Sequence, residues 1–79
     1  MKKYHGKILH TIEENHPDIK YVDGWTKDKV FTFEDTYTFE DDCTEENIIH
    51  FIKRDLMMVA GGGYNTDHIG IVAFEITKA

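Results

Sequence analysis

The clearest pattern along the chain is the alternation of hydrophobic and polar side chains between residues 30 and 39. One set of alternate positions carries four aromatic side chains: Phe31, Phe33, Tyr37 and Phe39. The other set holds Val30 and four polar residues. A period of two residues places one set on each face of a β-strand. The pattern therefore predicts a strand with one buried and one wet face, as in an antiparallel sheet.

A second pattern, between residues 44 and 60, has the period of an α-helix. The hydrophobic side chains that fall within about 100° on the helical wheel are Ile48, Ile49, Ile52, Leu56 and Val59. Thr44 can cap the N-terminus of this helix, and Glu45 and Glu46 complement the helix dipole in its first turn. The glycines at 61–63 predict where the helix ends.

Residues 2–15 fit two structures. On a helical wheel, one arc collects the hydrophobic side chains Met1, Tyr4, Ile8, Leu9 and Ile12. This arc favours an amphipathic helix that ends before the single proline. Gly6 inside the segment and the order of its charges, lysines first and glutamates last, oppose a helix. As a strand, the segment places Tyr4, Ile8 and Ile12 on one face. We prefer the helix and keep the strand as the alternative.

Two further segments predict strands. Residues 19–25 alternate between hydrophobic and other side chains, and we expect them to form a hairpin with 30–39. Residues 68–77 are hydrophobic on both faces, which is typical of a central strand covered on both sides. The expected order is α-β-β-α-β, or β-β-β-α-β if residues 2–15 form a strand. Either order gives a small α+β fold, with an antiparallel-containing sheet of three or four strands packed against one or two helices.

The length limits both the number of domains and the size of the core. The 79 residues suffice for a single domain, 1–79. A domain of this size buries only about 60% of the surface that its unfolded chain exposes. Phe51 and Met58 project away from the predicted helix stripe, and one face of 68–77 has no evident partner. We expect a homodimer, because association covers such surplus hydrophobic surface.

Cysteine content and the N-terminus bear on the location of the protein. Cys43 is the only cysteine, so no disulfide can form within the chain, and a reducing cytoplasm is the expected location. The basic N-terminus is not followed by the apolar run of a signal peptide. No stretch approaches the roughly 18 apolar residues of a membrane span, so we expect no membrane partner.

The charge of the chain is concentrated in one segment. The net charge is −6, but residues 1–30 hold six lysines and five acidic residues, which sum to +1, and residues 51–79 sum to zero. Residues 31–50 hold seven acidic side chains and no basic one. Net negative charge opposes direct binding to nucleic acid or to an anionic membrane. Acidic residues at the start of a helix also stabilise it, so part of this segment has a purely structural explanation.

No residue pattern indicates a catalytic or metal centre. None of the five histidines has a second histidine four residues away on one helix face: His5, His10, His16, His50 and His68. We expect them to be solvated or singly hydrogen-bonded. The glycines 61–63 follow a helix, whereas a phosphate loop precedes one, and Cys43 has no neighbouring base that would activate it. Asp35 interrupts the aromatic face of 30–39, where we expect a bulge or bend that turns it to water. We expect no catalytic residue, no metal and no cofactor.

Together these observations predict a non-enzymatic protein that binds another protein. The expected surface combines acidic residues with two apolar anchors: Glu34, Glu40, Asp41, Asp42, Glu45, Glu46, Phe51 and Met58. Such a surface would attract a basic partner in a salt-dependent way. The small size is typical of an accessory protein of a prokaryote or phage.

Two other functions are compatible with the sequence. A small-molecule or metal-binding enzyme would need a pocket, which a chain this short would form at a dimer interface lined by histidines. A DNA mimic that inhibits a nucleic-acid-binding protein would present carboxylates at phosphate-like spacing. Alternate strand residues lie about 6.6–6.8 Å apart, close to two phosphate steps of one DNA strand.

Overall fold

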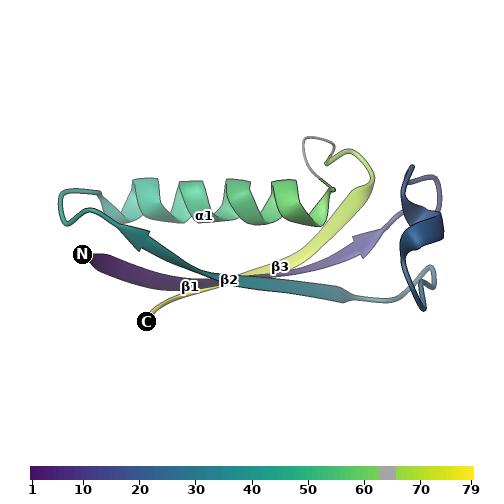
Figure 1. Cartoon of the computed structure of the whole chain (residues 1–79), viewed down its shortest axis with the longest axis horizontal. Helices are drawn as coiled ribbons and strands as arrows, with labels where there is room; N and C mark the ends of the chain where they lie inside the picture. Colours follow the sequence, from purple (N-terminus) through teal and green to yellow (C-terminus); the bar gives the residue numbers. More distant parts are fainter. Residues whose placement is uncertain (63–65) are drawn as a thin grey trace.

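A three-stranded antiparallel sheet carries one α-helix on one of its faces (Figure 1). The computed structural model describes residues 1–62 and 66–79. Its elements are β1 (Lys2–Ile12), the 3-10 turn η1 (Ile19–Tyr21), β2 (Phe31–Phe39), α1 (Glu45–Ala60) and β3 (Ile69–Lys78). The sheet order is β2-β1-β3. The α+β class is confirmed, with the alternative order in which the chain begins with a strand.

The segment at the N-terminus is the central strand β1, so the preferred helix over 2–15 is wrong. Alternate residues Tyr4, Gly6, Ile8 and His10 are buried on the side of α1. A Cβ atom at Gly6 would lie 2.5 Å from Cγ2 of Ile52 on α1. The glycine that disfavours a helix is therefore the residue that lets α1 pack closely on the sheet.

Residues 19–25 form no strand. Ile19–Tyr21 is a 3-10 turn within a long connection between β1 and β2, at one end of the molecule (Figure 1). Nε1 of Trp25 donates a hydrogen bond to the carbonyl oxygen of Ile12 at 3.0 Å, which holds this connection against the end of β1. The expected hairpin of 19–25 with 30–39 is also wrong, because β2 pairs with β1, as in the pair Ile8 and Phe33.

The last strand, β3, lies at an edge of the sheet, although its hydrophobic character on both faces predicted a central strand. Among the strands that the structure describes, it pairs with β1 alone. The ladder contains one extra residue of β3, Val72, because Leu9 pairs with Ala73 and His10 pairs with Ile71. Ile71 and Val72 remain 43% and 56% exposed. The hydrophobic surface of β3 is therefore only partly covered within one copy of the chain.

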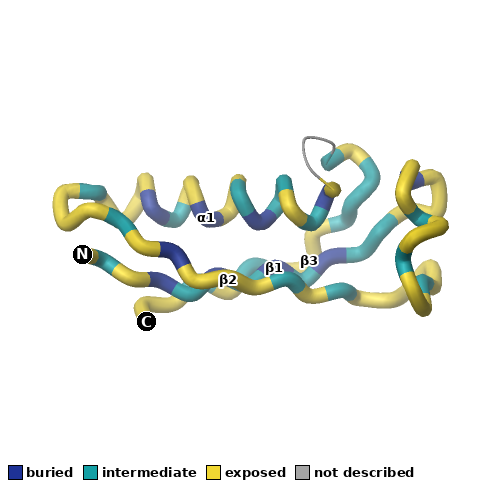
Figure 2. Tube along the Cα trace, viewed as in Figure 1, coloured by how far each residue is buried: buried dark blue, intermediate teal, exposed yellow. Residues whose placement is uncertain are grey.

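The core fills the layer between α1 and the sheet (Figure 2). Its buried hydrophobic residues come from β1, β2 and α1: Tyr4, Ile8, Tyr37, Ile48, Ile52 and Leu56. Phe33, Phe74 and Ile76 pack against this cluster and are partly buried. The core is small, and it lies wholly on one side of the sheet.

The predicted helix is confirmed within one residue at its start. Oγ1 of Thr44 accepts a hydrogen bond from the Asn47 N–H at 3.3 Å, as an N-cap does. Gly62, at a left-handed φ of +75°, follows the last turn. The predicted stripe is too wide, because Val59 is 45% exposed. Residue 63, the last of the predicted glycine stop, lies outside the described residues.

The sheet face opposite α1 is polar. The alternate residues of β2 on this face are Thr32, Glu34, Thr36 and Thr38. Nε2 of His5 lies 3.4 Å from a Glu34 carboxylate oxygen, and Nζ of Lys7 lies 3.8 Å from a Glu75 carboxylate oxygen. This face can therefore remain in water without a second layer.

Candidate protein-binding surface

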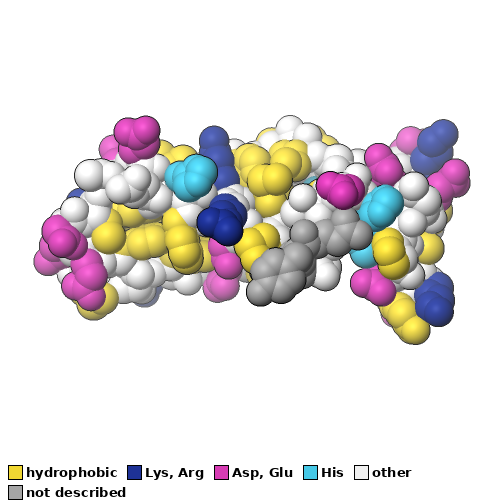
Figure 3. Space-filling model, turned by 90° about the horizontal axis from the view of Figure 1, so that it is seen from above, with side chains coloured by type: hydrophobic (Ala, Val, Ile, Leu, Met, Phe, Trp, Pro, Cys, Tyr) yellow, Lys and Arg dark blue, Asp and Glu magenta, His cyan; other side chains and the backbone are white. Residues whose placement is uncertain are grey.

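Five of the six acidic residues predicted for the binding surface lie within seven consecutive positions, 40–46. Acidic side chains gather at this end of the molecule, on the left in Figure 3. They lie in the short loop after β2 and in the first turn of α1, and all are exposed: Glu40, Asp41, Asp42, Glu45 and Glu46. We call these five residues the acidic end. The Thr44 cap begins α1 directly after the loop, so consecutive carboxylates are held close together.

Positive groups at the same end reduce its charge only in part. The amino group of Met1 lies 2.9 Å from the Asp41 carboxylate, and Nζ of Lys2 donates to the carbonyl oxygen of Cys43 at 2.7 Å. Lys3 and Lys78 lie in the sheet strands at this end. In the described part of the chain, the other four carboxylates of the acidic end form no ion pair.

The structure places Glu34 away from the acidic end. This residue is on β2, and its side chain lies on the polar face of the sheet beside His5. The acidic end lies beyond the last residue of β2, where the chain turns toward α1. The predicted surface is therefore divided, and Glu34 does not extend the cluster.

An aromatic patch adjoins the acidic end. The ring of Phe51 on α1 makes edge-to-face contacts with Phe39 and Tyr37, at centroid distances of 5.6 and 6.3 Å. Phe51 still exposes 52% of its surface. Phe39 directly precedes Glu40 in the chain, so the aromatic patch adjoins the loop that begins the acidic end.

Met58, the second predicted anchor, lies further along α1. It lines a shallow groove together with Phe51, Arg54 and Asp55. The groove brings both predicted apolar anchors to one side of α1. Met58 therefore extends the aromatic patch in the direction away from the acidic end.

A short hydrogen bond fixes β2 to α1 beside this patch. Oη of Tyr37 donates to Oδ2 of Asp55 at 2.7 Å. Burial, this hydrogen bond and the negative charges of Asp55 and Asp35 raise the pKa of Tyr37 above its ordinary value. The protonated hydroxyl is the donor in this bond, which joins β2 to α1 beside the ring contact of Tyr37 with Phe51.

Two histidines meet at the opposite end of the molecule. The rings of His16 and His68 are 5.8 Å apart and edge to face. His16 is buried; its Nδ1 accepts from the Asp18 N–H at 3.0 Å, and its Nε2 lies 3.3 Å from the carbonyl oxygen of Gly61. The expectation of solvated or singly hydrogen-bonded histidines is wrong for His16. Its ring joins the β1–β2 connection to the end of α1.

In the described ranges 1–62 and 66–79, His16 and His68 are not part of a metal site. No three His, Cys, Asp or Glu side chains there are placed to hold an ion. Zinc needs three or four such ligands. Both ring nitrogens of His16 already face backbone groups, which assigns this residue a structural role.

His10 is the other buried histidine. It is 5% exposed on β1 and stacks on the ring of Phe31 at 6.0 Å. Its Nδ1 has no hydrogen-bond partner among the described residues. Burial lowers the pKa of His10, although a hydrogen bond with the backbone of Thr11 opposes this change.

We expect His10 to make the fold less stable in mild acid. Its folded pKa is lower than its unfolded value of about 6.5, so the unfolded chain binds the proton more strongly. This contribution is complete above about pH 6.5 and is lost as the pH falls through the folded pKa. Urea denaturation from pH 7.5 to pH 5 measures it. The loss of stability on acidification should be smaller for His10→Leu than for the wild type, and equal losses would contradict the prediction.

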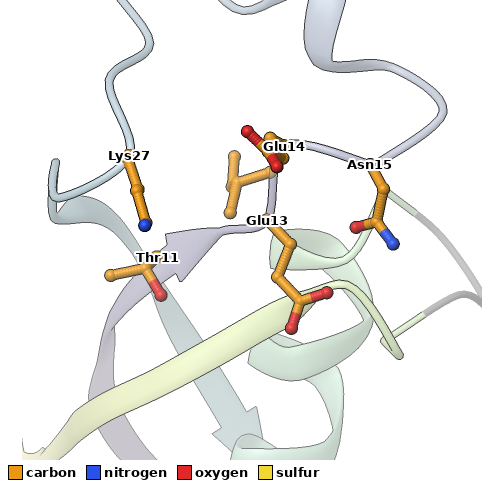
Figure 4. A pocket seen from close by; sticks show the side chains of 6 residues that line it. Thr11, Glu13, Glu14, Asn15 and Lys27 are labelled. Atoms are coloured by element: carbon orange, nitrogen blue, oxygen red, sulfur yellow. The ribbon is translucent and has the colours of Figure 1, made fainter.

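A shallow hollow near the β1–β2 connection has no convergent chemistry. Its lining residues are Thr11, Ile12, Glu13, Glu14, Asn15 and Lys27 (Figure 4). Lys27 points toward Thr11, whereas Glu13 points toward the start of β3, where its carboxylate lies 3.8 Å from Nδ1 of His68. The polar groups do not converge on one point, so the hollow indicates no reaction class.

Asp35 is exposed, but not because of a bulge. It pairs with Gly6 in an uninterrupted ladder between β1 and β2, so the expected bulge at 34–35 is wrong. Its Oδ1 accepts a hydrogen bond from the Thr36 N–H at 2.8 Å. An edge strand lets this carboxylate reach water from the side of the sheet that carries α1.

Comparison with known proteins does not assign the chain to a family. No family model, curated protein or solved structure matches it. In the part of the chain that the structure describes, no helix has the length and apolar character needed to cross a membrane. The fold and the surface define a small α+β domain with an acidic end beside an exposed aromatic patch.

Proposed function

We propose that this protein is a non-enzymatic cytoplasmic protein that acts by binding a basic partner protein. One observation carries the proposal: the half-exposed ring of Phe51 packs on Phe39, the residue that directly precedes the acidic end. Carboxylates attract and orient a basic partner, while a half-exposed aromatic ring supplies the hydrophobic contact typical of binding hot spots. The small size fits an accessory protein of a prokaryote or phage.

The geometry favours this function over the two alternatives. A DNA mimic needs a regular row of carboxylates, and Glu34 is separated from the acidic end on the polar face of the sheet. An enzyme needs polar groups that converge on a pocket, and the hollow beside Lys27 has diverging ones. We also propose that the chain forms a homodimer, because hydrophobic side chains of β3 are exposed.

The salt dependence of binding tests the proposal. The protein is immobilised, partners are captured from a lysate of the source organism, and each partner is identified and purified. We expect a partner with a basic surface whose association rate falls on the order of tenfold or more between low and high salt. Partners that are acidic, or that associate equally fast at both salt concentrations, would contradict the proposal.

A further inference from the structure

We infer that two copies of the chain associate by pairing their β3 strands edge to edge, which joins two sheets into one. The inference rests on the homodimer proposed above and names its interface. The observations that support it are the direction of the backbone groups along β3, the position of its extra residue and the charges of its side chains.

The hydrogen bonds between β3 and β1 show which backbone groups of β3 point away from β1, toward the open edge of the sheet. The Ala79 N–H donates to the carbonyl oxygen of Lys3 at 3.0 Å, and the Glu13 N–H donates to the carbonyl oxygen of His68 at 2.8 Å. Inward-bonding and outward-pointing residues alternate along an antiparallel strand. Ala79 and His68 bond toward β1, and the alternation can be followed from each of them as far as Val72. The backbone groups that point away from β1 then belong to Ile69, Ile71, Phe74 and Ile76. At the margin of this set, the Ile69 N–H already contacts the Thr66 carbonyl oxygen at 3.4 Å.

The extra residue of β3 shifts the alternation of its side chains between the two faces of the sheet. Ile71 pairs with His10 and Phe74 pairs with Ile8, and both partners are buried beneath α1. Residues on the α1 side are therefore odd-numbered before Val72 and even-numbered after it. A two-fold axis between Val72 and Ala73 then pairs residues of the same face, as an antiparallel sheet requires.

In this register Ile71 lies opposite Phe74 of the second copy, and Ile69 lies opposite its Ile76. These are the residues whose backbone groups point outward, so the central pair would exchange both of its hydrogen bonds. Hydrophobic side chains of the two copies would become neighbours on the face that carries both helices. The pairing would cover Ile71 and Val72, which are exposed in a single copy.

Charges along the strand are compatible with the same register. Glu75 lies opposite Gly70 of the second copy, so within Ile69–Lys78 no two like charges face each other. Like charges directly opposite would destabilise the pairing of strands.

The other edge of the sheet is less suited to pairing. His5 bonds toward β3, so its partner Thr36 on β2 directs its backbone groups outward. The Thr36 N–H is already bound to the carboxylate of Asp35 at 2.8 Å. A charged side chain that occupies an edge in this way is a known protection against strand addition. The structure therefore directs association to β3.

A second copy fits this edge better than a regular strand of another protein. In this register Val72 of each copy lies opposite Ala73 of the other, so both strands have the same two residues between Ile71 and Phe74. A regular strand would leave Val72 unmatched, as β1 does on the inner side. We therefore assign the edge to self-association.

Sedimentation equilibrium of matched variants tests the inference. We expect a dimer at tens of micromolar for the wild type, and at least tenfold weaker dimerisation for Ile71→Lys. The control is Val59→Lys, which places the same charge on a residue of similar exposure on α1 and should dimerise like the wild type. A wild-type monomer at several hundred micromolar, or equal effects of the two variants, would overturn the inference.

Amide hydrogen exchange gives a second measurement that needs no variant. The outward amides of Ile71, Phe74 and Ile76 should exchange several-fold more slowly as protein concentration rises, whereas the outward amide of Thr38 on β2 should not change. Protection on β2 instead of β3 would overturn the inference. The Glu40→Lys, Asp42→Lys variant should dimerise normally, so this test can fail or succeed independently of partner binding at the acidic end.

Discussion

Replacing Gly6 with alanine should lower the free energy of unfolding by about 1–3 kcal/mol, the usual cost of overpacking a core. The new methyl group would lie 2.5 Å from Cγ2 of Ile52 and 3.3 Å from Cδ1 of Leu56. Both of these side chains are fully buried, so any movement away from the methyl group is toward other core side chains. Without this contact, the same substitution would stabilise the chain by up to about 1 kcal/mol through the unfolded state.

A double-mutant cycle isolates the contact. Ile52→Ala should cost about 2–5 kcal/mol in the wild type, as buried large-to-small substitutions do. The same change should cost less in Gly6→Ala, because it also removes the atom that the new methyl group strikes. Urea denaturation followed by circular dichroism measures all four proteins. If the two substitutions had additive effects on the free energy of unfolding, the proposed contact between residue 6 and Ile52 would be contradicted.

The N-terminal segment shows why sequence patterns mispredicted one element. Tyr4, Ile8 and Ile12 are spaced by four residues, and a spacing of four satisfies both the helical period and the strand period. Gly6 and His10 lie between them on the same face of the strand, but outside the hydrophobic arc of the helical wheel. Both are buried here, the glycine because α1 approaches it and the histidine because it stacks on Phe31. The contacts that favour the strand come from distant parts of the chain.

The elements that were predicted well have long and unambiguous periods. The segment that forms β2 alternates throughout except at Asp35, and α1 carries both a cap and a stripe over four turns. The edge position of β3 was not predictable, because hydrophobic residues on both faces normally indicate a central strand. Its exposed hydrophobic side chains are the basis of the proposed pairing between copies.

The acidic end could be predicted because its residues are consecutive, and a loop followed by a helix N-terminus keeps them together. Glu34 precedes Glu40 by six residues, and an extended strand separates such residues by about 20 Å, so its separation from the acidic end follows once the strand is recognised. The contact of His16 with His68 joins residues far apart in the sequence. No local pattern indicates such a contact.

Reversing two charges at the acidic end should weaken binding to the partner at least tenfold, or about 1.4 kcal/mol. Glu40→Lys with Asp42→Lys is the preferred variant because both residues are exposed and neither forms an ion pair among the described residues. Asp41 is left intact because it contacts the amino group of Met1. Glu45 and Glu46 are left intact because they stabilise the first turn of α1.

The matched control reverses two exposed acidic residues in the β1–β2 connection, Asp23→Lys with Asp28→Lys, and changes the net charge equally. The decisive measurement is the dissociation constant of the captured partner for the wild type and both double variants at one salt concentration. Our account predicts at least tenfold weaker binding for the acidic-end variant and less than a twofold change for the control. Equal effects of the two variants, or no effect of either, would contradict a binding role for the acidic end.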